Sequence, residues 1–263
     1  MASRSGSAIA RVLLVVSGLI VLGVAFLYTR LPRPEADRVE AALDVVGVDT
    51  GGAFAWILRT PHGAALIDAG LDPKAEAILT ELRHQGLGPD DVHTVLLTHG
   101  HADHFGGAGA FSKAKVYVGA DDAAFVRGEA TPKGAIQSLF RRFAPEPARP
   151  APSAIATLRG GETLEVDGIS LKVIAVPGHT PGSLMYLHEG LLFTGDSLVG
   201  RDDGRKVGLV PASLSADADQ NERSLRPLLA LPFTAIADGH TGVVADARQK
   251  LARLLGKDRA GRP

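Results

Sequence analysis

The 263-residue chain contains no cysteine and has almost no excess of charge of either sign. Without thiols it cannot form a disulfide, hold a metal through thiolate or use a cysteine nucleophile, so any metal must be bound by His, Asp or Glu. The formal net charge of −1 creates no broad electrostatic field, and we therefore expect no nucleic-acid partner. Hydrophobic residues make up 45% of the chain, which is enough for a large globular core.

Charged side chains are also missing from one long stretch near the amino terminus. Val12 to Tyr28 is a run of 17 uncharged residues, and with its flanks it approaches the roughly 20 residues that span a bilayer. Residues 1–30 are therefore predicted to form an N-terminal hydrophobic helix that acts as a transmembrane signal anchor. A cleaved signal peptide is the alternative, although no clear small-x-small cleavage site precedes Thr29.

The anchor also predicts where the rest of the chain lies. First spans usually enter the membrane with the amino end inside, so we expect a single-pass protein whose main domain is extracytoplasmic, in the periplasm. If the segment is cleaved instead, the domain would be secreted. Residues 31–40 contain prolines and are predicted to form a short extended linker.

Glycine and proline are plentiful, at 31 and 16 residues, and they separate short apolar runs. Over residues 41–263 these runs give strands, a helix and a strand, and then the same order again. Two such halves predict an α/β fold, an αββα four-layer sandwich of two mixed β-sheets flanked by helices, as one domain. Residues 128–154 end in a proline-rich run and are expected to be a surface insertion that forms one wall of a pocket.

Some local elements can be predicted more closely. Hairpin turns are expected at Asp167–Gly168 and at Glu189–Gly190. Outside the insertion, in which a helix is predicted over residues 135–143, helices are predicted over Pro73–Gln85 with Asp72 as N-cap, over Asp219–Ala230 and over Val243–Leu255.

The densest group of metal-binding residue types is THGHADHFGG, residues 98–107. It places His99, His101, Asp103 and His104 within six positions, directly after an apolar strand. A solvated run of histidines would be more uniformly polar and would not follow a strand. Imidazole and carboxylate together suit zinc, with iron or manganese as alternatives. These residues are therefore predicted to bind metal.

Three further residues of this kind stand at the predicted exits of later strands. GHTPGS contains His179, FTGDS contains Asp196 and ADGHTG contains His240, each among glycines that let loops approach closely. Each alone is more typical of a structural histidine or a turn aspartate. Their order after the first cluster makes them candidate ligands as well.

Three other residues leave less specific expectations. Asp68, in LIDAG, either accepts a hydrogen bond from a ligand histidine or serves as an N-cap or turn aspartate. Trp56 and Phe54 lie on an apolar strand and are expected in the core, not against a substrate.

THGHADHFGG followed by GHTPGS, GDS and DGH resembles the motifs of the metallo-β-lactamase superfamily, over nearly all of residues 41–256. The resemblance implies the αββα fold and a pair of divalent metal ions, with zinc as the first choice. By motif, His99, His101 and His179 would bind the first metal, Asp103, His104 and His240 the second, and Asp196 would bridge both.

Such a centre implies an enzyme that hydrolyses a small-molecule substrate. Two divalent ions about 3.5–4 Å apart can share a hydroxide, lower its pKa and direct it at a carbonyl carbon or phosphorus. Asp103 is the candidate catalytic residue, because it is both a ligand and the group best placed to handle the nucleophile's proton.

The resemblance also narrows the reaction. The bridging Asp196 favours the glyoxalase II or lactonase type, since β-lactamases of this superfamily generally lack an aspartate there. Only 23 residues follow His240, so we do not expect the C-terminal glutathione-binding extension of glyoxalase II. Flavodiiron proteins carry a glutamate where His101 stands, which disfavours a redox function.

We expect hydrolysis of an ester, a lactone or a thioester. The alternatives are β-lactam or phosphodiester hydrolysis, or a non-catalytic metal-binding or sensor domain. A non-catalytic relative would be expected to have lost ligands, whereas this chain keeps all seven.

Overall fold

The structure is a computed structural model that describes residues 38–42, 44–132, 142 and 144–257. All of these residues belong to one compact unit, Pro34–Pro263. The predicted anchor over residues 1–30 lies outside the described residues, as do most of the predicted linker and most of the helix predicted over residues 135–143. Among the helices that the structure describes, none has the length and apolar character of a membrane span.

The first half of the described chain forms a seven-stranded sheet whose strands lie side by side in chain order. Its strands are β1 (Arg38–Ala42), β2 (Val45–Asp49), β3 (Phe54–Thr60), β4 (Gly63–Ile67), β5 (Val92–Leu96), β6 (Lys115–Gly119) and β7 (Ile155–Leu158). The first four strands pair antiparallel, and β4 to β7 pair parallel. Helices occupy the connections that parallel strands require.

The second half forms a six-stranded sheet in the order β15-β14-β11-β10-β9-β8. Its strands are β8 (Thr163–Val166), β9 (Ile169–Ala175), β10 (Leu184–His188), β11 (Leu191–Gly195), β14 (Ala235–Asp238) and β15 (Val243–Val244). Only β11 and β14 pair parallel within it. The turns predicted at Asp167–Gly168 and Glu189–Gly190 are confirmed, because all four residues have positive φ, as a two-residue type I′ turn requires.

Helices cover the outer faces of the two sheets. The helices are α2 (Glu76–His84), α3 (Ala102–Phe105), α4 (Ala123–Arg127), α6 (Ala218–Leu225) and α7 (Ala247–Lys257). Short 3-10 turns are η1 (Pro89–Asp91), η2 (Ala108–Ala110), η3 (Ala120–Asp122), η4 (Pro152–Ala154), η5 (Ala212–Leu214) and η6 (Arg226–Ala230). A separate hairpin consists of β12 (Val199–Arg201) and β13 (Lys206–Gly208).

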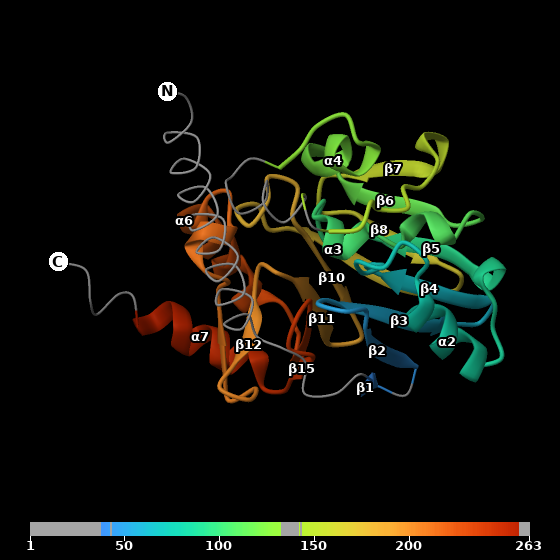
Figure 1. Cartoon of the computed structure of the whole chain (residues 1–263). Helices are drawn as coiled ribbons and strands as arrows, with labels where there is room; N and C mark the ends of the chain where they lie inside the picture. The colour runs from blue at the N-terminus through green and yellow to red at the C-terminus, as the bar shows by residue number, and fades with distance from the viewer. Residues whose placement is uncertain (1–37, 43, 133–141, 143, 258–263) are drawn as a thin grey trace, which may run out of the picture. The chain divides into compact units, whose positions relative to one another are not determined.

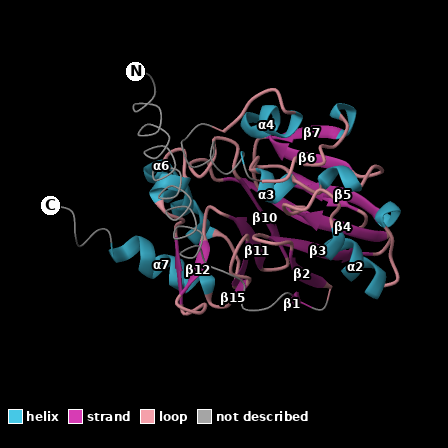
Figure 2. Cartoon of the chain, in the orientation of Figure 1, coloured by secondary structure: helices cyan, strands magenta, loops and turns pink. Residues whose placement is uncertain are grey.

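Alternation along the strands explains the layers. In β4, Leu66 packs with α2, whereas its neighbour Ile67 packs between the sheets beside Trp56 and Phe193. The second sheet packs in the same way against α6 and α7, and Leu251 of α7 is one of the buried residues in this layer. Because both faces of the sheets are covered at β4 and β11, every residue of these two strands is buried. The predicted α/β fold with two mixed sheets is confirmed, and Figures 1 and 2 show the helices outside the strands.

Two predicted helix starts are wrong. The helix predicted from Pro73 begins at Glu76, because Ala75 adopts a left-handed φ of 52°. Asp72 still accepts hydrogen bonds from the backbone N–H groups of Lys74 and Glu76, at 3.0 and 2.8 Å. The helix predicted from Val243 begins at Ala247, since Val243 and Val244 pair with β14 as a short strand.

A third predicted helix, Asp219–Ala230, is divided. The α-helix ends at Leu225, and a 3-10 helix continues to Ala230. Pro227 lacks the N–H group that would extend the α-helical hydrogen bonds.

The carboxyl end of the predicted insertion packs against the core. The N–H of Ala148 donates to the carbonyl of Gly106, and the N–H of Gly109 donates to the carbonyl of Ala148, both at 2.7 Å. The Arg149 guanidinium lies 5.2 Å from the ring centre of Phe105. This part of the insertion is therefore fixed beside α3, which carries two of the candidate ligands.

Candidate metal centre

The seven predicted ligands lie together where strands of the two sheets end. Their ligand atoms form three groups, each within 4.8 Å, namely His99–His101–His179, Asp103–His104–His240 and His99–His104–Asp196. The third group shares one histidine with each of the others, so the seven residues form one continuous cluster. The first two groups coincide with the two ligand sets that the motifs predict.

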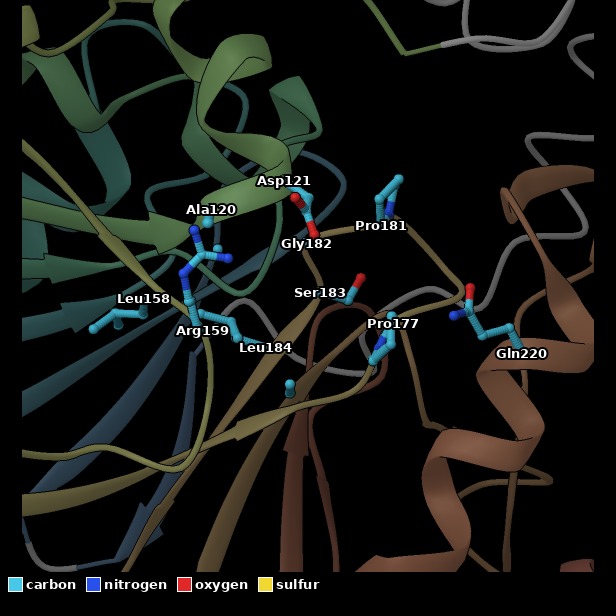
Figure 3. A pocket seen from close by; sticks show the side chains of 12 residues that line it. Ala120, Asp121, Leu158, Arg159, Pro177, Pro181, Gly182, Ser183, Leu184 and Gln220 are labelled. Carbon is cyan, nitrogen blue, oxygen red and sulfur yellow. The ribbon is translucent and has the colours of Figure 1, made fainter.

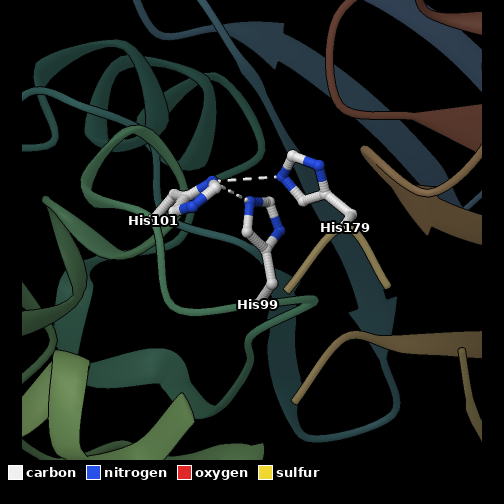
Figure 4. A group of neighbouring side chains, drawn as sticks. All are labelled: His99, His101 and His179. Carbon is white, nitrogen blue, oxygen red and sulfur yellow. Dashed lines mark hydrogen bonds between the residues drawn. The ribbon is translucent and has the colours of Figure 1, made fainter. Parts of the chain in front are cut away.

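The first group brings three imidazoles around one point (Figure 4). Nδ1 of His101 lies 3.1 Å from Nε2 of His99 and 3.1 Å from Nε2 of His179. Burial lowers the pKa of His99 well below its usual value and that of His179 to about 3. Both rings are therefore neutral and present lone pairs, which is the form that binds a metal.

Hydrogen bonds at Nδ1 hold the two histidines of the second group. Nδ1 of His104 lies 2.8 Å from Oδ2 of Asp68, and Nδ1 of His240 lies 2.7 Å from the carbonyl oxygen of Gly52. These bonds leave Nε2 of each ring directed at the cluster. Asp103 completes the group and is the more open residue, with 23% of its side chain exposed.

Asp196 lies between the two groups. Its Oδ1 is 3.3 Å from Nε2 of His104, and its Oδ2 is 3.1 Å from Nε2 of His240 and 3.6 Å from Nε2 of His179. Burial raises the pKa of this carboxyl, but the neighbouring His240 and His104 hold it well below its usual range. Asp196 is therefore an ionised carboxylate that faces ligands of both groups.

The cluster fits divalent cations. Nε2 of His104 and Oδ1 of Asp196 are buried and face each other, yet neither has a hydrogen-bond partner within the described part of the chain. A cation would satisfy both atoms. Burial lowers the pKa of His240, but Asp196 outweighs it and raises the pKa to about 9. The centre therefore favours positive charge, and nitrogen and oxygen ligands suit zinc, iron or manganese.

The two interpretations of Asp68 are decided by its contacts. Besides the bond to His104, its carboxylate accepts hydrogen bonds from the N–H and the hydroxyl of Thr98, both at 2.7 Å. Asp68 is 1% exposed and has a φ of 61°. It orients a candidate ligand from a left-handed turn. Trp56 and Phe54 are buried in the core, as predicted.

Two buried aspartates at the site were not predicted. The carboxylate of Asp238 accepts hydrogen bonds from the N–H groups of His240, Thr241 and Gly200 at 2.7, 2.6 and 2.7 Å. Asp238 is the first residue of the DGH motif, so the motif could have identified it. Asp122 accepts bonds from the loops of His99 and His179. Its partners are distant in sequence, and no motif marks it.

A separate cavity of about 380 Å³ adjoins the loop that follows His179 (Figure 3). Its lining includes Pro181, Ser183, Asp121, Arg159 and Gln220, and none of the seven candidate ligands contributes to it. The cavity is therefore distinct from the metal centre.

Comparison with known proteins agrees with this geometry. Residues 48–259 match the family model described as the metallo-beta-lactamase superfamily. A hydroxyacylglutathione hydrolase from Dechloromonas aromatica (strain RCB) is 31% identical over 169 residues, which cover 63% of this chain and 51% of that protein. One from Xanthomonas axonopodis pv. citri (strain 306) is 32% identical over 196 residues, with 74% and 63% covered. The chain thus spans about half to two thirds of the length of these curated relatives.

Solved structures share the fold. A metallo-beta-lactamase family protein from Thermus thermophilus superimposes with a TM-score of 0.61 at 28% identity, over 88% of this chain and 78% of that one. Metallo-beta-lactamase SMB-1 superimposes with a TM-score of 0.64 at 20% identity, over 88% and 97%. Since the matched family region contains all seven clustered residues, the chain belongs to the metallo-beta-lactamase superfamily.

Proposed function

We propose that the protein is a hydrolase that uses two divalent metal ions to cleave an ester, a lactone or a thioester of a small molecule. The observation that carries this proposal is the position of Asp196, whose two oxygens face His104 on one side and His240 and His179 on the other. A carboxylate placed in this way can serve two cations at once, whereas a structural zinc site usually holds a single metal with four ligands.

Each residue has a role in this proposal. Bound divalent cations would supply Lewis-acid polarisation and lower the pKa of water. Neutral His99 and His179 offer lone pairs, and Asp68 orients His104. The partly exposed Asp103 can hold or pass on a proton at its carboxylate.

The curated relatives support an acyl substrate. They are named hydroxyacylglutathione hydrolases, and hydroxyacylglutathione is a thioester. The β-lactamases among the structural neighbours are at most 24% identical and support the fold alone. Ester, lactone and thioester hydrolysis therefore comes first among the activities to test.

The test combines metal content with turnover. The purified chain would be loaded with zinc, analysed by elemental analysis and assayed on a thioester, a lactone, an ester, a β-lactam and a phosphodiester. We expect two metals per chain and turnover of an acyl substrate, and loss of turnover in Asp103→Asn. Two bound metals without turnover of any substrate would instead support the binding or sensor function.

The membrane anchor over residues 1–30 and the extracytoplasmic location are separate proposals. Fractionation of cells that express the full chain would test them. We expect the protein in the membrane fraction after a high-salt wash, and external protease should digest it in spheroplasts but not in intact cells. Recovery in the cytoplasmic fraction would contradict both proposals.

A further inference from the structure

One buried carboxylate outside the seven candidate ligands joins two ligand loops. Oδ2 of Asp122 accepts hydrogen bonds from the N–H of Gly100 at 2.8 Å and from the hydroxyl of Thr180 at 2.6 Å. Its Oδ1 accepts a bond from the N–H of Gly182 at 2.9 Å. Gly100 lies between His99 and His101, and Thr180 directly follows His179.

Close packing fixes these contacts. A Cβ atom on Gly100 would lie 3.1 Å from Cβ of Asp122, and one on Gly182 would lie 2.6 Å from the backbone nitrogen of Asp122. Side chains at these two positions would therefore push both loops away from the carboxylate. Asp122 is itself 0% exposed, so water does not compete for its oxygens.

The loop that follows His179 is also braced internally. The hydroxyl oxygens of Thr180 and Ser183 are 2.7 Å apart, and the N–H of Thr180 donates to Oγ of Ser183 at 3.0 Å. A backbone bond from Leu184 to the carbonyl of Thr98, at 2.7 Å, joins the two loops at a second point. Asp122 adds the side-chain connection next to the ligands themselves.

We propose that Asp122 is a positioning residue that holds His99, His101 and His179 in the geometry that binds the first metal. This inference rests on the proposed function, since it requires that these histidines bind a cation. The three ligands come from loops of both sheets, and Asp122 ties the two loops to one place at the end of β6. The second group, Asp103–His104–His240, has other supports, in Asp68 and Gly52.

Asp122→Asn is the decisive variant because it keeps the size of the side chain. Its amide NH₂ must replace one of the two oxygens. In one orientation the NH₂ faces the N–H of Gly182, and in the other it faces the N–H of Gly100, so one of these two backbone hydrogen bonds is lost in either case. Loss of a group that orients metal ligands typically lowers metal affinity about 10- to 100-fold.

The experiment measures zinc affinity in two backgrounds by competition with a chromophoric chelator. His240→Ala disables the second group and His101→Ala the first. We expect Asp122→Asn to weaken zinc binding about 10- to 100-fold in the His240→Ala background and to leave it unchanged in the His101→Ala background. The matched control is Asp121→Asn, which removes the same charge from an exposed neighbour and should change neither affinity.

Thr180→Val covers the case in which Asp122→Asn does not fold. The substitution removes one of the three hydrogen bonds to Asp122 and keeps the shape of the side chain. We therefore expect a smaller loss of zinc affinity, again only in the His240→Ala background. Equal effects of these variants in both backgrounds, or no effect in either, would overturn the positioning role while the proposed function stands. A wild-type chain that binds no divalent metal would overturn both.

Discussion

Nδ1 of His104 lies 2.8 Å from Oδ2 of Asp68, and both side chains are almost completely buried. The same carboxylate accepts two bonds from Thr98, so it has no freedom to turn away. As an acceptor, the Asp68 carboxylate places a proton of the imidazole on Nδ1 and leaves Nε2 facing the cluster. In the proposed centre, this pair holds His104 in the orientation that would bind a metal.

Asp68→Asn should therefore weaken metal binding by the second group. The Asn amide would turn its NH₂ toward Nδ1 of His104, which favours the other tautomer and removes the lone pair at Nε2. The left-handed backbone at this position should survive, because asparagine tolerates it. We expect a loss of affinity of about 10- to 100-fold, measured by zinc competition in the His101→Ala background. Unchanged affinity would show that Asp68 is only a turn residue.

Asp196→Ala should reduce the occupancy of both metals. Its carboxylate faces His104 and His240 of the second group and His179 of the first, so its removal would take a shared ligand from both proposed metals. Elemental analysis of the purified variant would show the loss, with circular dichroism as a check on folding. Full retention of two metals would contradict the bridging role.

Gly119 and Gly256 should respond to alanine in opposite directions. A Cβ atom at Gly119 would lie 1.9 Å from the carbonyl oxygen of Gly182, and the overpacking should cost about 1–3 kcal/mol of unfolding free energy. Gly256 lies in α7, and within the described residues nothing lies within 4 Å of the added atom, so Gly256→Ala should raise the stability by up to about 1 kcal/mol. Urea denaturation would measure both changes, and a neutral Gly119→Ala would contradict the close approach of Gly119 to Gly182.

The pair of Arg38 and Glu81 should make stability depend on pH. Nε and Nη2 of Arg38 donate to the carboxylate of Glu81 at 3.0 and 3.2 Å. Burial raises the pKa of Glu81, but the bonds from Arg38 and Gln85 outweigh it and bring the pKa below its ordinary value of 4.5. Because the folded pKa is the lower one, the pair stabilises the protein above about pH 4.5, and this stability is lost as the pH falls through the folded pKa.

Glu81→Gln should therefore cost about 1 kcal/mol at pH 7 and almost nothing once Glu81 is protonated. Solvent around the half-exposed Arg38 keeps the effect small. Glu40→Gln is the matched control, since Glu40 also pairs with Arg38 but is 69% exposed and should contribute little. Urea denaturation at pH 7 and pH 3 would measure the difference, and equal losses at both values would contradict it.

The seven candidate ligands could be found from the sequence because each follows an apolar strand and the motifs keep a recognisable order. The two sheets could be predicted for a related reason, since short apolar runs and turn residues are local signals. Asp122 could not be found, because its partners at Gly100 and Gly182 are brought to it only by the packing of two loops. Ala75 has a left-handed backbone that no property of alanine predicts, which explains the misplaced start of α2.

Each sheet is made by one continuous half of the chain, and both halves contribute to each candidate metal group. His99 and His101 meet His179 from the other half, and Asp103 and His104 meet His240. A chain cut in the turn at Gly160–Gly161, between β7 and β8, would therefore give two fragments with incomplete coordination spheres. Zinc should hold such fragments together by binding ligands from both, and zinc uptake would therefore measure their reassembly. The affinity of the two fragments for each other would then depend on the concentration of divalent metal.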